Sequence, residues 1–447
     1  MSIPLISIVR RAWLMLCLSG TLGAAEAPAA REFTAAERLQ RDQLARTHEA
    51  VATLAQTRTN LPPLTGHHDF RAIFHAHADD SAHTGGTAPE LLADAQRAGV
   101  HAVFLSDHHR PPRDFMNSWR GLHDGVLFVP GSEARGFLLH PMSSVASRME
   151  APVPELIPAV TANGGLAFLS HIEERPDHSM AGLQGLEIYN RHYDAKRDMV
   201  GLIALAMRLT DPKELAELQD LVRLYPDELL AAQVRQPQVY LDKWDTETQA
   251  GRRLTGVGAN DCHHNQIFIA KMVDEASVRI GTNVDKDEGL RVVTAALRPG
   301  IRELVRGHQP GEVVARVDFD PYYRALRNLS THLLAPELTE PALRAALVAG
   351  HAYVSHDWLC DPTGFRFEAG SAILGDEVKL TPTTELRVQT PVACHLRLLR
   401  HGVEVAAVDG RELRFAVKEP GVYRCEATLI LAGDIRPWIY SNPIYVR

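Results

Sequence analysis

Metal-binding side chains stand at the ends of several apolar, strand-like runs in this sequence. Seven are histidines and two are carboxylates, a donor set that suits Zn, Mn or Fe without choosing among them. A lone histidine usually does other work, but nine such residues in equivalent places predict a metal cluster. The candidate ligands are His75, His77, His83, His108, Glu133, His140, His171, Asp261 and His263.

The segment Ile73–His83 contains the clearest part of this pattern. On a β-strand, residues i and i+2 project to the same face, so His75 and His77 can bind one ion. The apolar run Val103–Leu105 likewise ends in ligand-type residues that include His108. Further apolar runs end in the same way, so the candidate ligands lie where predicted strands end.

Helical patterns separate the strand-like runs. One helix is predicted over Pro89–Ala98, before Gly99, and another over Glu155–Ala162. The alternation continues from Gly66 to about Asn265 and indicates βαβ units, which form a parallel sheet or barrel. In parallel α/β barrels, functional groups gather on the loops at the C-terminal ends of the strands.

An insert over about residues 191–240 interrupts the ligand-bearing strands. It contains two helical patterns, over Met199–Leu209 and over Pro212–Leu224. Asp211 before Pro212 is a good helix cap. The insert is either a lid over the site or an elaboration that packs against the domain.

The two ends of the chain have patterns of their own. In an N-terminal helical segment over residues 26–63, a helix from Thr34 to about Gln56 begins with a capping box that Glu37 completes. From residue 361 to 447 the pattern changes to short alternating strands, which predicts a small β-sandwich.

Two features of the C-terminal strands can be checked in a structure. Turns are predicted at Asp409-Gly410 and at Pro420-Gly421. Cys394 and Cys425 both lie in strand-like stretches, and they form either a disulfide or two buried free thiols.

Length and charge limit the possible functions. The 447 residues suit a barrel of more than about 200 residues with a smaller domain. A net charge of -8 and the lack of a Lys/Arg run argue against a stable nucleic-acid partner. After the N-terminus, no apolar run is long enough to cross a bilayer. A small-molecule substrate is expected, and the sequence does not indicate an oligomeric state.

The first 25 residues have the pattern of a secretory signal peptide. Arg10 and Arg11 precede an apolar run, Ala12–Leu22, and small residues follow up to Ala25. The alternative is a short buried helix. Cleavage near Ala25 and a periplasmic or secreted location are therefore expected.

Other catalytic motifs are missing from the sequence. It contains no Gly-x-Ser-x-Gly elbow, no phosphate-binding Gly-rich loop and no dinucleotide fingerprint. Serine hydrolase, kinase and dehydrogenase functions are therefore excluded.

The order of the candidate ligands resembles the PHP (polymerase and histidinol phosphatase) metallohydrolase domain. The series H-x-H-x5-H, S/T-D-H, G-x-E, S-H and D-x-H covers roughly residues 66–270. The frame LDKWDTETQAGRRLTGVGANDCHH and the ending PWIYSNPIYV are similar to the CehA/McbA-type branch. The resemblance implies an α/β fold: a distorted (β/α)7-type barrel over residues 64–360, with a smaller all-β, sandwich-like domain over residues 361–447.

The same resemblance implies two to three divalent metal ions. It assigns His75, His77, Glu133 and Asp261 to a first ion, Glu133, His140 and His171 to a second, and His83, His108 and His263 to a third.

Two ions joined by a carboxylate lower the pKa of a shared water, so a hydroxide bridged between them can attack phosphorus or an acyl carbon. Glu133 and Asp261 are accordingly the expected catalytic carboxylates. The preferred function is an exported metal-dependent phosphoesterase for a small phosphate ester. One alternative is an amide, carbamate or ester hydrolase with the same cluster. Another is a non-catalytic, metal-stabilised binding module.

Residues beside the ligands have open roles. His109 and His264 directly follow candidate ligands. Both are candidates for proton transfer or for orienting ligands, and His264 also for substrate binding; the alternative is that both are exposed neighbours. Arg175, and with it Arg110, would hold an anionic substrate group, or Arg175 belongs to a solvated run of charges.

Overall fold

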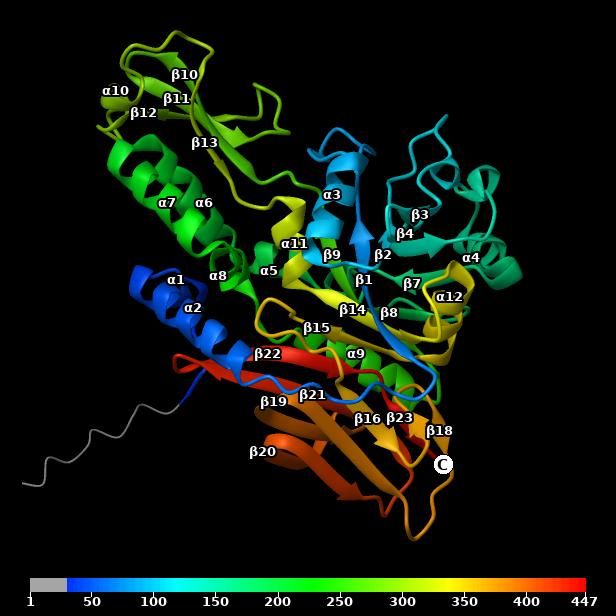
Figure 1. The fold of residues 1–447 in the computed structure, drawn as a ribbon. Helices are drawn as coiled ribbons and strands as arrows, with labels where there is room; N and C mark the ends of the chain where they lie inside the picture. Colours follow the sequence, from blue (N-terminus) through cyan, green and yellow to red (C-terminus); the bar gives the residue numbers. More distant parts are fainter. Residues whose placement is uncertain (1–29) are drawn as a thin grey trace, which may run out of the picture.

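The computed structural model describes residues 30–447 (Figure 1). The predicted signal peptide lies outside the described residues. None of the described helices is both long and apolar enough to span a membrane.

A mixed sheet with a parallel centre carries the predicted ligands. Its order is β3-β4-β2-β1-β9-β8-β7-β6-β5, and every neighbouring pair from β4 to β7 is parallel. The outer strands β3, β6 and β5 are antiparallel to their neighbours. The bounds are β1 His68–Ala76, β2 Ala102–Leu105, β3 Gly121–His123, β4 Val126–Val129, β5 Ser132–Ala134, β6 Phe137–His140, β7 Leu166–Leu169, β8 Gly185–Asn190 and β9 Thr255–Cys262.

Alternate residues of these strands form an apolar core. Phe74 and Phe104 stack with their ring centroids 4.2 Å apart, and Phe168 meets Phe74 edge to face. Helices α3 and α11 pack against the opposite face, in a second apolar core that includes Ile73 and Val103. Helix α3 begins at the capping box of Thr87 and ends at Gly99, whose φ is 70°. The bounds of the helices outside the insert are α3 Ala88–Ala98, α4 Val153–Thr161, α9 Gln238–Gln249, α11 Tyr322–Asn328 and α12 Glu340–Ala349.

The α/β class is confirmed, but a closed barrel is not. Within residues 30–447, no ladder joins β4 to β5 or β6. Instead β1 also pairs with β14, and the sheet continues through β15 and β22 into the C-terminal strands. The first two of these strands are β14 Ser330–Ala335 and β15 Ala352–Ser355.

The C-terminal strands form an all-β region, as predicted, but one predicted turn is wrong. Asp409 and Gly410 lie inside β20, where they pair with His395 and Cys394 of β19. The predicted chain reversal near Pro420 is found one residue earlier, because β20 ends at Ala416 and β21 begins at Gly421. The bounds are β16 Arg366–Ala369, β17 Ala372–Ile373, β18 Glu377–Val378, β19 Glu385–Arg400, β20 Val403–Ala416, β21 Gly421–Leu431, β22 Asp434–Ser441 and β23 Ile444–Val446.

Cys394 and Cys425 are buried free thiols. In the ladder between β19 and β21, Cys425 pairs with Leu398, four residues along the strand from Cys394. At about 3.3 Å per residue, the two Cα atoms are roughly 13 Å apart. A disulfide needs less than about 7 Å, so the register excludes the bridge.

A four-stranded antiparallel sheet, order β12-β11-β10-β13, follows β9 and has no counterpart in the sequence-based expectations. Leu205, Leu218 and Leu221 of the insert share an apolar core with Phe268 and Val278 of this sheet. The insert helices and this four-stranded sheet therefore pack together as one lobe (Figure 1). The bounds are α5 Arg191–Arg197, α6 Met199–Met207, α7 Pro212–Leu224, α8 Pro226–Leu230, α10 Ile301–Leu304, β10 Ile267–Asp274, β11 Ser277–Thr282, β12 Arg291–Thr294 and β13 Val313–Asp318.

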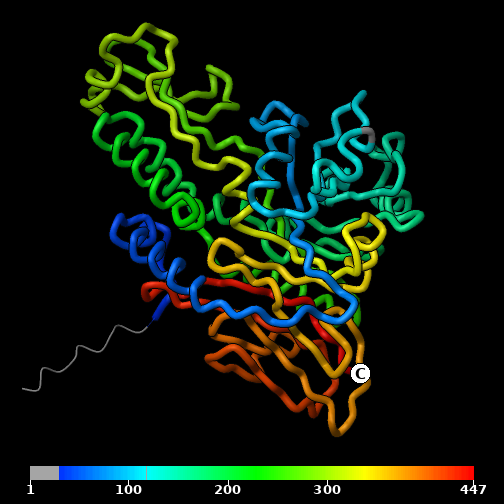
Figure 2. The backbone as a smooth tube through the Cα atoms, in the orientation of Figure 1, coloured from blue at the N-terminus to red at the C-terminus, as the bar shows by residue number. Residues whose placement is uncertain are grey.

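The predicted N-terminal helix is two helices, α1 Ala35–Arg38 and α2 Arg41–Gln56. The capping box of Thr34 and Glu37 is confirmed. Arg38 forms a buried ion pair with Asp434, at 2.7 Å, which ties the N-terminal segment to the C-terminal strands beside it (Figure 2).

Candidate metal centre

Seven of the nine predicted ligands meet in three overlapping groups. They come from β1, β5, β9 and the segments that follow β1, β2, β7 and β9. Within each group, the possible ligand atoms lie within 4.8 Å of one another. The groups are His75, His77 and Asp261; His75, Glu133 and His171; and His77, His108 and His263.

The backbone that presents His75 and His77 is not a regular strand. The registers of β1 against both neighbours shift between Phe74 and Ala76, and His75 between them has a φ of 59°. His77 follows the end of β1. The two histidines do share a ligand group, but through a bulge at His75 rather than through the expected i, i+2 alternation.

Three candidate ligands have left-handed backbone conformations. The φ values are 59° for His75, 48° for His171 and 49° for Asp261. Such conformations cost about 1–3 kcal/mol each and persist where the surroundings impose them. The carboxylate of Glu187, fully buried in β8, lies 2.7 Å from Nδ1 of His75 and accepts the backbone N–H of His171 at 2.8 Å. Glu187 therefore orients two ligands.

Asp80 orients two other ligands. One of its carboxylate oxygens lies 3.0 Å from Nδ1 of His77 and 2.6 Å from Nδ1 of His108, and it accepts the backbone N–H of His108 at 2.7 Å. With the proton on Nδ1, each ring keeps Nε2 free for a metal. The prediction missed Asp80 and Glu187, although a charged residue inside the apolar run of β8 is a usable signal.

The two carboxylate ligands connect the groups. One oxygen of Glu133 lies 3.1 Å from Nε2 of His171, and the other lies 3.4 Å from Nε2 of His108 and 3.5 Å from that of His75. Asp261 similarly lies 3.4 Å from Nε2 of His75 and 3.5 Å from that of His171. Each carboxylate therefore lies within 3.5 Å of histidines that belong to different ligand groups.

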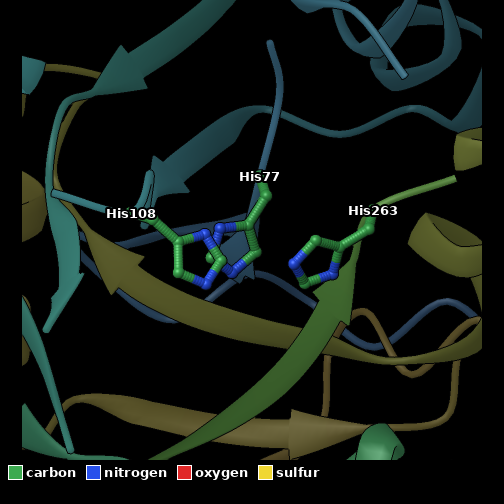
Figure 3. Close-up of side chains that lie close together, drawn as sticks. All are labelled: His77, His108 and His263. Carbon is green, nitrogen blue, oxygen red and sulfur yellow. The ribbon is translucent and has the colours of Figure 1, made fainter. Parts of the chain in front are cut away.

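The third group consists of three imidazoles. Figure 3 shows the ring of His77 between those of His108 and His263, with centroid distances of 4.5 and 4.0 Å. His83 lies beside this group but outside it. Its exposed ring is 4.7 Å from that of His108 and 5.0 Å from that of His263.

His140 lies outside the three groups. It is the last residue of β6, which runs antiparallel to β7, so it pairs with Leu166 at the start of β7 and not with the end that leads to His171. Its buried ring packs edge-on against Phe74 and Phe104, at centroid distances of 6.3 and 5.4 Å.

Burial and neighbouring charges shift the pKa values of the histidines in opposite directions. Burial lowers the pKa of His77 and, with the charge of His77, lowers the pKa of His263 to about 3. Burial also tends to lower the pKa of His108 and of His171, but contacts with carboxylates outweigh it. They raise the pKa of His108 to about 9 and that of His171 to about 10. Bound cations would displace the protons that these two rings otherwise hold.

Three buried ring nitrogens make the clearest case for metal binding. Nε2 of His75, His77 and His263 has no hydrogen-bond partner among residues 30–447. A buried polar atom without a partner costs about 1–3 kcal/mol. A cation coordinated by these nitrogens and by the carboxylates would remove that cost, so the donor set fits divalent metal ions.

Of the four residues that the sequence analysis named beside the ligands, only Arg175 lines the cavity at the centre. His264 points away from the groups and contacts Glu90 at 2.8 Å and Asp318 at 3.1 Å. His109 is partly buried and, like His264, is not among the residues that line the cavity at the centre. Arg175 lines this cavity but lies 3.2 Å from Glu174. Arg110 is exposed.

The cavity beside the metal-binding groups has a volume of about 270 Å³ and includes Glu133 and Asp261 in its wall. Arg191 and His192, which the sequence-based prediction missed, also line it. Both follow the end of β8, as the ligands follow other strands, and that position was the available signal. A larger cavity of about 390 Å³ lies at the other end of β1, beside His68, away from these groups.

Comparisons with known proteins give one similar solved structure. No protein-family model matches the chain, and no curated protein matches it. The chain is similar to a two-domain protein from Bacteroides vulgatus that contains a predicted PHP-like metal-dependent phosphoesterase, at 14% identity and a TM-score of 0.36. The match covers 86% of this chain and 98% of the other. A likeness at this level does not assign a family.

Proposed function

We propose that this protein is an exported, metal-dependent hydrolase of the PHP type that cleaves small phosphate esters. The unpartnered Nε2 atoms of His75, His77 and His263, beside two carboxylates and a cavity, are the observation that supports it. When bound, divalent ions would supply a hydroxide near neutral pH and neutralise charge on the phosphoryl oxygens.

The protein's own residues would prepare this chemistry. Glu133 and Asp261 hold the histidine groups at a common centre, while Asp80 and Glu187 fix the rings. Asp261, whose pKa is lowered because the charge of His75 outweighs its burial, would remain an anion that helps to hold divalent cations. Electrostatic preorganisation of this kind needs no activated serine or cysteine.

Metal analysis and a substrate screen test the proposal. Purified protein should contain two to three divalent ions per chain, and it should hydrolyse phosphate monoesters or diesters when they are compared with aryl carbamates, amides and carboxylic esters. Turnover of the carbamates, amides or carboxylic esters alone would replace the phosphoesterase by the amidase or esterase alternative. Metal binding without turnover of any of them would favour the non-catalytic module.

A further inference from the structure

Arg191 is a buried cation on the wall of the candidate active-site cavity. It is the first residue of α5, directly after β8, and only 7% of its surface is exposed. Among the described residues, no hydrogen-bond or ion-pair partner lies within reach of its guanidinium group, whereas the neighbouring His192 lies 4.0 Å from Asp261. A charge removed from water is costly unless an anion accompanies it.

The nearby carboxylates already have other contacts. Asp194 accepts hydrogen bonds from Tyr189 and Arg197. Asp320 accepts the backbone N–H of Gln266 at 2.8 Å. Burial raises the pKa of Asp320 to about 6 even though the charge of Arg191 opposes this. Neither carboxylate forms an ion pair with Arg191, so its donors remain available to the cavity.

We propose that Arg191 binds the anionic phosphoryl group of a phosphate monoester in this cavity. This inference rests on the proposed function and specifies its substrate class. A guanidinium group offers parallel N–H donors that match two phosphate oxygens, which a diester or a neutral carbamate satisfies less well. At about 270 Å³, the cavity suits a small substrate.

Arg175, which the sequence analysis named as a candidate for this role, is the weaker of the two arginines. Its guanidinium lies 3.2 Å from Glu174, and about a third of the side chain is exposed. An anion that reached Arg175 would compete with this carboxylate, whereas Arg191 has no such competitor within ion-pair distance.

Phosphate binding to variants tests the assignment. The dissociation constant of inorganic phosphate is measured by calorimetry on metal-loaded wild-type, Arg191→Gln, Arg191→Lys and Arg197→Gln proteins. Arg197 is the matched control because it lies on the same helix and is paired with Asp194 outside the cavity. Arg191→Gln should weaken phosphate binding at least 10-fold, Arg191→Lys by less, and Arg197→Gln by less than twofold, with metal content unchanged.

Kinetics give a second readout. With a phosphate monoester, Arg191→Gln should raise KM at least 10-fold and should lower kcat/KM more for monoesters than for diesters. If folded Arg191→Gln protein keeps phosphate affinity and KM within twofold of wild type, the inference is overturned. If wild-type protein binds phosphate through Arg191 but hydrolyses no phosphate ester, the proposed function fails while the anion site stands.

A test on the wild-type protein avoids any folding defect of the variants. Phenylglyoxal modifies accessible arginines, and mass spectrometry of peptides reports the modification of Arg191. Inorganic phosphate should slow this modification selectively, compared with that of Arg197. Equal rates with and without saturating phosphate would contradict the proposal.

Discussion

At the scale of single residues, the centre depends on carboxylates that touch more than one histidine group. Glu133 places one oxygen near His171 and the other near His75 and His108. Its side chain is partly exposed to the cavity, while β4 before it is buried and apolar. We therefore expect the carboxylate of Glu133 to contribute to the metal-binding groups and little to the stability of the fold.

We therefore expect Glu133→Gln to lower kcat by at least about 100-fold, because a neutral amide cannot hold two cations together. The thermal unfolding midpoint of the metal-free protein should change little. Kinetics, metal analysis and circular dichroism measure these effects. A variant that keeps more than about a tenth of the wild-type rate, a barrier increase of only ~1.4 kcal/mol, would disprove the bridging role.

Glu187 is a positioning residue, since it contacts His75 and the backbone of His171 rather than the cavity. Glu187→Gln should weaken metal affinity about 10- to 100-fold, as loss of an orienting partner does in other metal sites. Titration of metal-free protein with Zn²⁺ measures this affinity.

Glu228→Gln is a suitable control for Glu187→Gln. Glu228 is also buried, but it lies in α8 and contacts His48 of α2. Neither residue belongs to the three ligand groups. The control should change stability without changing metal affinity. Equal loss of affinity in both variants would show that Glu187 acts only through general stability.

At the scale of elements, charged contacts join neighbouring strands of the sheet. His332 of β14 lies 2.7 Å from Asp69 of β1 and 3.2 Å from Asp357, which follows β15. Burial disfavours the charged ring, but the two carboxylates outweigh it and raise the pKa of His332 to about 10. The ring is therefore charged in the folded protein at neutral pH.

This contact predicts a pH-dependent stability. A histidine whose folded pKa is raised stabilises fully below its ordinary pKa of 6.5 and loses that contribution as the pH rises through about 10. Between pH 7 and pH 10, the free energy of unfolding should fall by at least about 1 kcal/mol more in wild type than in His332→Gln. Urea unfolding of both metal-free proteins measures it, and parallel pH profiles would refute the assignment.

At the scale of the whole molecule, buried ion pairs join segments that are far apart in sequence. Arg38 pairs with Asp434, and Arg424 pairs with Asp245 of α9 at 2.7 Å. The C-terminal strands therefore contact both the N-terminal segment and a helix beside the ligand-bearing sheet. They are packed against the domain that carries the ligands.

Export is a prediction from the N-terminal sequence pattern. The mature protein should begin near Glu26 and should fractionate outside the cytoplasm, because charged, apolar and small-residue regions follow one another before that point. Such cleavage would leave the first described contacts, from Arg31 onward, intact. Intact mass spectrometry of protein from periplasmic and cytoplasmic fractions measures it. A cytoplasmic product that retains Met1 would contradict the prediction.

The sequence by itself determined the features that depend on near neighbours in the chain. The capping box of Thr34 and Glu37 and the left-handed Gly99 follow from local hydrogen bonding and sterics. The apolar run before each ligand likewise predicted that strands would end at these positions. Seven of the nine candidate ligands accordingly meet at one centre.

The tertiary structure decided what depends on distant contacts. Glu187 and His75 are 112 positions apart, and no local pattern relates them. The bulge at His75, the burial of His140 and the distance between Cys394 and Cys425 all follow from the registers of strands against their partners. Arg175 has its sequence neighbour Glu174 as a partner, whereas only the folded structure shows that Arg191 is buried beside the cavity with no carboxylate of the described residues within ion-pair distance.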